Sequence, residues 1–354
     1  MSLATTLARP EIVALVPYAS ARREQLGGDL LLNANESPWN NSGVAGANRY
    51  PDCQPSQLRQ QYADYAQLTP QQVLISRGAD EGIDLLIRTF CRPGQDSISC
   101  LTPSYGMYAI SAATNAVACN SLPWASQYQL PADLAAQCGN SKLLFVCNPN
   151  NPSGSCVNPA QLAALAAQLP QTLLVVDEAY IEFAPERSVA NLIDTTPNLV
   201  VLRTLSKAFA LAGARCGFVL ANRDIIAMLE KVIAPYPVPA PVAQLACEAT
   251  SPDGLALMAQ QVAQLNKQKA KFTAAIRSLE GIDKVIDSQA NFVLFQCVNS
   301  EQVQSALADS GLLIRRYRSA NLLGWLRVSI GTDTQMETLL SALRQQLQLQ
   351  KERL

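Results

Sequence analysis

Short apolar runs alternate with helical patterns along the middle of the chain, from Val73 to Ala221. In the helical stretches, as in residues 83–90, apolar side chains recur at i, i+3, i+4 and i+7. This alternation predicts an α/β fold whose mainly parallel sheet is covered by helices on both faces. The seven candidate strands are residues 73–76, 97–101, 116–122, 143–147, 173–176, 199–202 and 217–220.

Prolines divide the chain into three parts. Three of them interrupt the first forty residues, and we expect residues 1–40 to form an arm that joins the small domain. The proline-rich segment 235–241 predicts a hinge after the alternating region. We therefore expect a large domain over residues 41–235 and a smaller α+β domain over residues 236–354.

The final third predicts its own set of elements. A long helix over residues 255–279 carries many Gln and Lys side chains. Two arginine-bearing runs, 312–316 and 325–331, are strand-like, and an arginine inside apolar sequence is either paired or binds an anion. The remaining expected elements are a strand at 291–295 and helices at 303–307 and 334–348.

Composition narrows the class of protein. The 354 residues carry a net charge of −1, which gives no electrostatic reason to expect nucleic acid or an anionic membrane as partner. No apolar run approaches the roughly 18–20 residues that cross a bilayer, and the first ten residues do not resemble a secretory signal. We therefore expect a cytoplasmic protein without nucleic-acid or membrane partners.

The counts of cysteine and histidine restrict the chemistry. The ten cysteines include no C-x-x-C pair, which favours reduced, mostly buried thiols over disulfides or zinc. The chain contains no histidine, which excludes Ser-His, Cys-His and His-metal mechanisms. We expect no metal site, and acid–base chemistry must use Lys, Tyr, Asp, Glu or a cofactor.

One lysine follows a buried apolar strand and has hydroxyl and arginine neighbours. Lys207 comes after the run 199–202, beside Thr204 and Ser206, and Arg215 follows eight residues later. A lysine can form a Schiff base with an aldehyde cofactor, while hydroxyls and a guanidinium can hold its phosphate. By itself the pattern also fits a solvated loop lysine.

The other strand ends add compatible groups. The turn at 77–82 opens a helix, whose free N–H groups suit a phosphate, although it also fits an ordinary connection. Asp177 directly ends an apolar strand, so a buried carboxylate there needs a cationic partner such as a pyridinium nitrogen. Aromatic residues at 102–108, the polar loop 148–154 and Tyr180 lie at further strand ends. Together they predict one phosphate-cofactor site.

Several motifs resemble one family. From Tyr18 to the C-terminus the chain resembles the fold type I pyridoxal-phosphate aminotransferases and, within them, the histidinol-phosphate aminotransferases. Ser153 stands where the family often has threonine, which keeps the hydroxyl. The superfamily motifs are Asn148–Gly154, Asp177–Tyr180 and Ser206-Lys207 with Arg215, and the subgroup motifs are Asn33–Glu36, Arg49–Asp52, Gly78–Glu81 and Arg203–Phe209.

The resemblance implies a role for each matching residue. Lys207 would form the Schiff base and shuttle a proton, while Asp177 would keep the pyridine nitrogen protonated. Asn151 and Tyr180 would bond the ring 3-oxygen, and Tyr105 would stack on the ring. The implied cofactor is pyridoxal 5'-phosphate. Its phosphate would meet Thr204, Ser206, Arg215 and the backbone at Ala79 and Asp80.

The resemblance also implies a partner and a reaction. Tyr50 matches a tyrosine that reaches into the neighbouring subunit's site, which implies a homodimer with shared active sites. The implied reaction, in histidine biosynthesis, converts L-histidinol phosphate and 2-oxoglutarate to imidazole-acetol phosphate and L-glutamate. The residues expected to meet the substrate are Tyr18, Asn35, Arg315 and Arg327. Whether Arg315 or Arg316 is the matching arginine stays open at this point.

Four alternatives compete with this function. An aromatic-amino-acid aminotransferase or a threonine-phosphate decarboxylase of the same superfamily would share most motifs. A binding or regulatory module could keep the fold without catalysis, but the intact set of Lys207, Asp177 and Asn151 argues against it. A nicotinamide dehydrogenase fits poorly because no G-x-G-x-x-G opens the first strand–helix turn.

Overall fold

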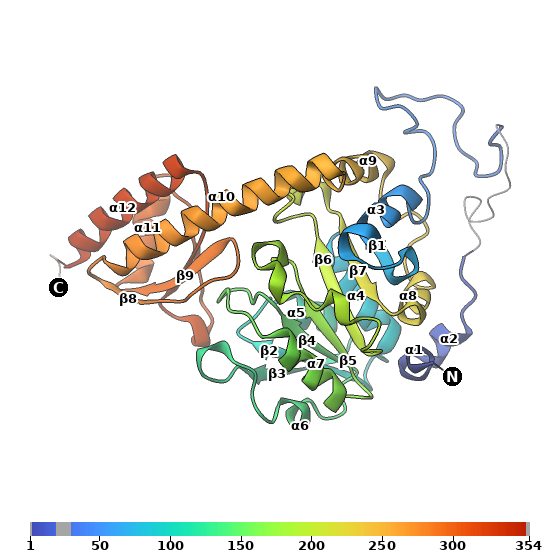
Figure 1. Cartoon of the computed structure of the whole chain (residues 1–354), viewed down its shortest axis with the longest axis horizontal. Coiled ribbons are helices and arrows are strands. Elements are labelled where there is room, and N and C mark those ends of the chain that lie inside the picture. Colours follow the sequence, from blue (N-terminus) through green and yellow to red (C-terminus); the bar gives the residue numbers. More distant parts are fainter. Residues whose placement is uncertain (1, 19–29, 352–354) are drawn as a thin grey trace.

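The computed structural model describes residues 2–18 and 30–351 (Figure 1). Residues 19–29 of the expected arm lie outside this range. In the described part no helix combines the length and apolar character that crossing a bilayer requires.

The large sheet contains all seven strands that the apolar runs predict. Its order is β1-β7-β6-β5-β4-β2-β3. In the part β6-β5-β4-β2-β3, every pair of adjacent strands is parallel. Strand β7 is antiparallel to both of its neighbours, β1 and β6. The prediction of a mainly parallel seven-stranded sheet is therefore confirmed. The strands are β1 Val73–Ser76, β2 Ser97–Thr102, β3 Ala118–Pro123, β4 Leu143–Cys147, β5 Leu173–Asp177, β6 Leu199–Thr204 and β7 Gly217–Ala221.

Helices cover both faces of this sheet, as predicted. Because side chains alternate along a strand, Leu144 and Val146 of β4 face one apolar cluster while Leu143 and Phe145 face the other. Helices α3 Ser56–Ala66, α6 Leu134–Cys138 and α7 Pro159–Gln168 contribute to the first cluster. Helices α4 Ala79–Phe90, α5 Met107–Thr114 and α8 Arg223–Glu230 contribute to the second.

The first residues are more ordered than the prolines suggest. Helices α1 Leu3–Leu7 and α2 Pro10–Ala14 lie beside α8 of the large sheet's covering layer. The backbone N–H of Arg9 donates to Thr89 O at 3.1 Å. Pro10 occupies the first turn of α2, where a missing N–H costs no helical hydrogen bond. The division of the chain at residues 40 and 235 stays a prediction.

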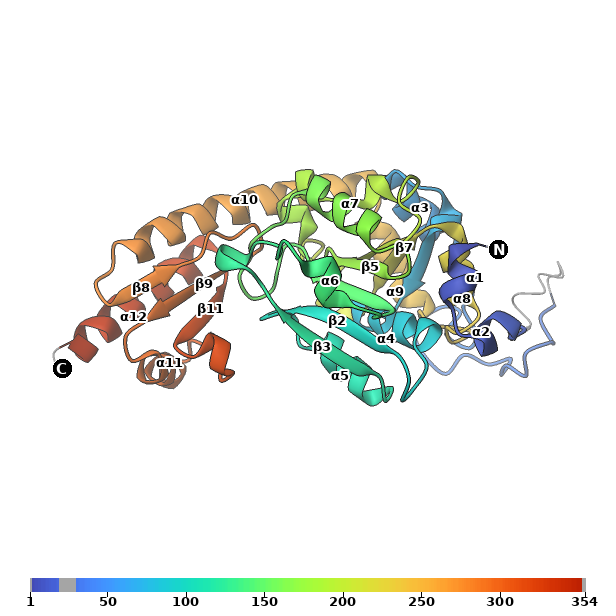
Figure 2. The same cartoon turned by 90° about the horizontal axis from the view of Figure 1, so that it is seen from below.

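A second, antiparallel sheet forms the other part of the molecule. Its order is β10-β11-β9-β8, with helices packed beside it (Figure 2). Strand β8 was not predicted because it is short and its two middle residues are charged and exposed. The strands are β8 Ile282–Val285, β9 Phe292–Cys297, β10 Arg315–Arg316 and β11 Trp325–Ser329, and the helices beside them are α10 Pro252–Arg277, α11 Ser300–Asp309 and α12 Asp333–Lys351. Helix α9 Ala240–Ala249 packs instead against α3 of the large part.

The two sheets meet at the loop after β4. The long helix α10 runs from the large part to the small one (Figures 1 and 2). The N–H of Gln289 donates to Gly154 O at 2.7 Å. Gly154 has a φ of +75°, and a Cβ there would lie 2.1 Å from Ser288 Oγ, so the close approach requires glycine. This contact brings β11 to the edge of the large sheet where the parallel strands end.

Candidate active site

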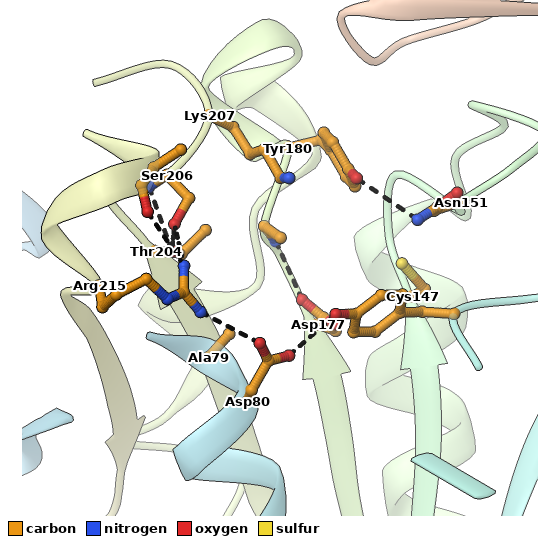
Figure 3. A pocket seen from close by; sticks show the side chains of 13 residues that line it. Ala79, Asp80, Cys147, Asn151, Asp177, Tyr180, Thr204, Ser206, Lys207 and Arg215 are labelled. Atoms are coloured by element: carbon orange, nitrogen blue, oxygen red, sulfur yellow. Dashed lines mark hydrogen bonds and ion pairs between the residues drawn. The ribbon is translucent and has the colours of Figure 1, made fainter. Parts of the chain in front are cut away.

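A cavity of about 160 Å³ opens at the carboxyl ends of the parallel strands (Figure 3). This is the position at which open α/β sheets bind ligands. All but one of the residues expected to bind the cofactor line the cavity. These are Ala79, Asp80, Tyr105, Asn151, Asp177, Tyr180, Thr204, Ser206, Lys207 and Arg215, and the cavity is completed by Cys147, Ala179 and Ala212.

Asp177 is a buried carboxylate at the floor of the cavity. It is the last residue of β5 and is 2% exposed. Its Oδ2 accepts a hydrogen bond of 2.6 Å from the Tyr108 hydroxyl, and its Oδ1 accepts one of 3.1 Å from the Ala179 N–H. Burial raises the pKa of Asp177 to about 6, against the lowering effect of these two bonds. A cation bound above the carboxylate would stabilise its charged form.

Lys207 approaches the same cavity from the turn after β6. Much of the residue is exposed, but its Nζ lies 5.5 Å from the centre of the Tyr180 ring (Figure 3). Partial burial and the charge of Arg327 lower the pKa of Lys207, whereas Asp177 opposes that shift. A lowered pKa increases the share of neutral amine, the form that attacks a carbonyl carbon.

One end of the cavity is built to hold an anion. Arg215 donates to Ser206 Oγ and to Asp80 Oδ2, each at 3.2 Å, and Thr204 donates to Ser206 Oγ at 2.9 Å. The 12-residue helix α4 begins here, so its first N–H groups have no helical acceptor. Gly78, at φ +79°, precedes the helix, and a Cβ there would lie 2.9 Å from Arg215 Nη2. Hydroxyls, a guanidinium and a helix N-terminus together suit a phosphate.

Aromatic and amide groups form the walls. The Tyr105 hydroxyl donates to Asp80 Oδ1 at 2.9 Å. Asn151 Nδ2 donates to the Tyr180 hydroxyl at 3.4 Å, and the Tyr180 ring meets Phe292 edge to face at 5.2 Å. Burial raises the pKa of Tyr180, so its hydroxyl stays a neutral donor. These groups can orient a polar planar ring between Tyr105 and Asn151.

Arg327 of the small sheet bonds Asn151, a residue of the cavity wall. Its Nη1 donates to Asn151 Oδ1 at 2.5 Å, and its guanidinium lies 5.0 Å from the centre of the Phe292 ring. Its Nε is buried and has no hydrogen-bond partner within the described ranges. A guanidinium held in this way can bind an anionic group of a substrate.

The register of the small sheet separates the two neighbouring arginines. Arg315 of β10 lies directly opposite Arg327 of β11, and opposite residues project from the same face of a sheet. Arg316 projects from the other face, where it pairs with Glu301 at 2.9 Å. Arg315, rather than Arg316, therefore shares a face with Arg327.

Besides Arg315 and Arg327 of the small sheet, three predicted residues lie outside the cavity lining. Tyr18 and Asn35 are exposed, and Tyr50 is 49% exposed with its ring stacked on Tyr236 at 4.5 Å. The subgroup motifs that contain Asn35 and Tyr50 nevertheless meet each other. Glu36 bonds the Arg49 side chain at 2.9 Å and the Tyr50 N–H at 2.6 Å. The structure thus groups these motifs in the arm without placing them in the cavity.

Two groups next to Asp177, the buried Tyr108 and the cavity-lining Cys147, were assigned no role from the sequence. Tyr108 bonds Asp177, and Cys147 lies beside Asp177 in the β4–β5 register. The segment 102–108 was expected to bring aromatic rings to the edge where the parallel strands end, but only Tyr105 was assigned a role. The direction of the Tyr108 side chain depends on how α5 packs, which the sequence pattern does not specify.

Comparison with known proteins agrees with this geometry. The family model of the class I and II aminotransferases matches residues 40–343, so the chain belongs to that class of pyridoxal-phosphate-dependent enzymes. It is 47% identical to the histidinol-phosphate aminotransferase of Shewanella oneidensis over 98% of this chain and 90% of that protein. It is 49% identical to that of Shewanella amazonensis, over 97% and 95%. The chain therefore belongs to the histidinol-phosphate aminotransferase family.

A solved structure of this family has the same fold. The histidinol-phosphate aminotransferase of Sinorhizobium meliloti, in complex with pyridoxal-5'-phosphate, superposes with a TM-score of 0.78. The two proteins are 26% identical, and the match covers 85% of this chain and 83% of that one. The fold type I architecture expected from the motifs is thereby confirmed.

Proposed function

We propose that this protein transfers the amino group of L-histidinol phosphate to 2-oxoglutarate, giving imidazole-acetol phosphate and L-glutamate. One observation carries the proposal: Lys207, Asp177 and an anion cradle surround a single cavity, and Arg327 bonds its wall at Asn151. The anion cradle consists of Thr204, Ser206, Arg215 and the first residues of α4. The high identity to histidinol-phosphate aminotransferases supports this substrate over the aromatic amino acids and threonine phosphate.

The cavity residues fit pyridoxal 5'-phosphate. When bound, this cofactor supplies an aldehyde carbon that joins amines and a ring that accepts electrons. Thr204, Ser206, Arg215 and the N–H groups at Ala79 and Asp80 would hold its phosphate. The fit rests on the chemistry of the donors: an anion cradle at one end of the cavity and a buried acid at its floor.

Four further side chains would orient the ring. Asp177 would accept a hydrogen bond from the protonated pyridine nitrogen. The positive charge of that nitrogen would offset the energetic cost of burying the carboxylate. Tyr105 would face the ring, while Asn151 and Tyr180 would bond its 3-oxygen. These positions restrain the ring on its face, at its nitrogen and at its oxygen.

Lys207 would perform the proton transfer. Its Nζ, with a lowered pKa, would bind the cofactor's aldehyde carbon in the resting enzyme. Nζ would also be the base that takes a proton from the substrate Cα and carries it onward. Tyr180, whose ring centre lies 5.5 Å from Nζ, would help to hold the amine in place.

The two substrates differ in their anionic group, since the donor carries a phosphate and the acceptor a carboxylate. Arg327 and Arg315 project from one face of the small sheet and would bind both anions through the planar guanidinium. Tyr18 and Asn35 of the arm would complete the substrate site. Arg327 also bonds Asn151, so binding of the anion and orientation of the ring would be connected.

The exposed position of Tyr50 supports a homodimer with shared sites. A large exposed aromatic ring on an extended arm suits burial against a second copy of the chain. We propose that Tyr50 of one protomer contacts the cofactor phosphate in its partner, and that the enzyme acts in the cytoplasm. Light scattering of the purified protein and cell fractionation test these two points.

A donor panel tests the proposed function. The purified protein would be incubated with pyridoxal phosphate, 2-oxoglutarate and either L-histidinol phosphate, phenylalanine or threonine phosphate, with glutamate and carbon dioxide measured. We expect rapid glutamate formation with L-histidinol phosphate and little with phenylalanine. A better rate with phenylalanine would make it an aromatic aminotransferase. Carbon dioxide from threonine phosphate without 2-oxoglutarate would make it a decarboxylase.

A further inference from the structure

Tyr108 makes the shortest polar contact to the buried acid of the cavity. Its hydroxyl donates to Asp177 Oδ2 at 2.6 Å, and both side chains are buried, with Tyr108 0% exposed. Asp177 Oδ1 receives its bond from the Ala179 N–H. Each carboxylate oxygen therefore has one protein donor, and each keeps further acceptor capacity for a ligand.

Two aromatic contacts hold the Tyr108 ring in this position. It stacks on Phe145 of β4 with centroids 4.8 Å apart and planes at 15°. It also meets Tyr105 edge to face at 5.7 Å and 83°. Since Tyr105 lines the cavity and bonds Asp80, the two tyrosines connect the anion end of the cavity to its acidic floor.

The protonation states give the hydrogen bond its direction. Burial and the adjacent Asp177 raise the pKa of Tyr108 well above its ordinary value, so the phenol keeps its proton. A neutral phenol beside a carboxylate donates, and this stabilises the charged form of the acid. Among the influences that lower the pKa of Asp177, the bond from Tyr108 is the largest.

We propose that Tyr108 is a positioning residue for the reaction: it holds Asp177 as an oriented carboxylate that faces the ring nitrogen of the bound cofactor. This inference rests on the proposed function. It assigns to Tyr108 no contact with substrate or cofactor. Its effect passes entirely through the geometry and charge of Asp177.

The test compares two tyrosine-to-phenylalanine variants. Tyr108→Phe removes the hydroxyl and keeps the ring stacked on Phe145. Tyr62→Phe is the matched control, because Tyr62 is equally buried and stacked on Phe218, while its hydroxyl has no hydrogen-bond partner within the described part of the chain. Both variants remove one buried oxygen, but only the first removes a donor to Asp177.

The first readout needs no cofactor. Carbon-13 NMR of the aspartate carboxyls, with Asp177 assigned through Asp177→Asn, gives its titration in the free protein. We expect Tyr108→Phe to raise the pKa of Asp177 by about one pH unit or more, as the loss of a charge-assisted hydrogen bond implies. Tyr62→Phe should leave this titration unchanged.

The second readout uses the loaded enzyme. In Tyr108→Phe we expect nitrogen-15 NMR of the bound cofactor to show a less protonated ring nitrogen. We also expect kcat to fall about tenfold with KM within about twofold. A merely structural role would change stability without moving the ring-nitrogen signal.

Failure of this inference is distinguishable from failure of the proposed function. If the wild-type protein binds the cofactor and turns over while Tyr108→Phe matches it in the Asp177 titration and the ring-nitrogen signal, the inference alone is overturned. If the wild-type protein binds no cofactor, the proposed function fails and the inference fails with it.

Discussion

The rim of the large sheet, where its parallel strands end, and the face of the small sheet that meets it through Arg327 and Asn151 present different kinds of groups. Asp177 at the rim is 2% exposed, ends a buried parallel strand and receives two hydrogen bonds. Arg315 on the small sheet is exposed and belongs to a strand of two residues. The rim thus fixes atoms tightly, whereas the small sheet presents long side chains that can adapt.

This difference matches what we propose that each set of residues binds. A cofactor that stays bound through every cycle suits groups fixed at the ends of buried strands. Two substrates with different anions suit arginines on a separate layer, which touches the rim through a few contacts such as Arg327 to Asn151. Substitutions at the rim should therefore damage chemistry, and substitutions on the small sheet should damage substrate binding.

The largest effect is expected at Lys207. Lys207→Ala should lower the transamination rate by at least about 10³-fold, because it removes both the amine that binds the cofactor and the proton carrier. Steady-state assay with L-histidinol phosphate and 2-oxoglutarate measures the loss. Lys284→Ala, at an exposed position of β8, is the control and should retain the wild-type rate. Substantial turnover by Lys207→Ala would refute the assignment.

The next effect concerns the stability of the cofactor-free protein. Folding raises the pKa of Asp177 from 3.8 to about 6, so the native state binds more protons and this group makes stability fall as pH rises from about 4 to 6. Asp177→Asn should remove this pH-dependent loss in the free energy of unfolding, which amounts to about 3 kcal/mol above pH 6. Urea unfolding of both proteins at pH 4 and pH 7 measures it. An equal stability difference at the two pH values would contradict the account.

On the small sheet, Arg327→Ala should weaken substrate binding most. Loss of a charge-assisted contact predicts that KM rises about 10- to 100-fold for both L-histidinol phosphate and 2-oxoglutarate. The Kd for pyridoxal phosphate should change much less, because the phosphate cradle is built by other residues. Unchanged KM values for both substrates would remove Arg327 from the substrate site.

Arg315→Ala should have the smallest effect of the series. Because the side chain is exposed and its guanidinium lies 5.9 Å from the centre of the Tyr317 ring, we expect KM for L-histidinol phosphate to rise only about tenfold or less. Arg316→Ala is the matched control on the opposite face and should leave KM unchanged. If Arg316→Ala raised KM more than Arg315→Ala did, the same-face argument would be wrong.

The rim was far easier to predict from the sequence than the small sheet. Strands such as Leu143–Cys147 are buried on both faces, so they appear as continuous apolar runs with the polar residues directly after them. Asp177 and Lys207 could therefore be assigned to one site before the structure was known. Parallel strand ends meet at one edge, which makes such a prediction geometrically secure.

The small sheet and the arm gave weaker signals. Strand β8 has one charged residue of each sign, and β10 is only two residues long, so neither shows a clear apolar period. The choice between Arg315 and Arg316 depends on pairing with β11, because a shift of one residue reverses the face of every side chain. Tyr108 was missed for a related reason, since its contact with Asp177 depends on tertiary packing.

The central claim is that a cofactor bound at Lys207 accepts an amino group from L-histidinol phosphate. The rim would hold that cofactor, and the small sheet would bind the substrate. The most direct test adds this donor, without any keto acid, to the purified cofactor-loaded protein and records the absorption spectrum of the bound cofactor. We predict one equivalent of imidazole-acetol phosphate per site and complete conversion of the cofactor to its amine form. A spectrum unchanged by L-histidinol phosphate, in a protein that does bind the cofactor, would contradict the account.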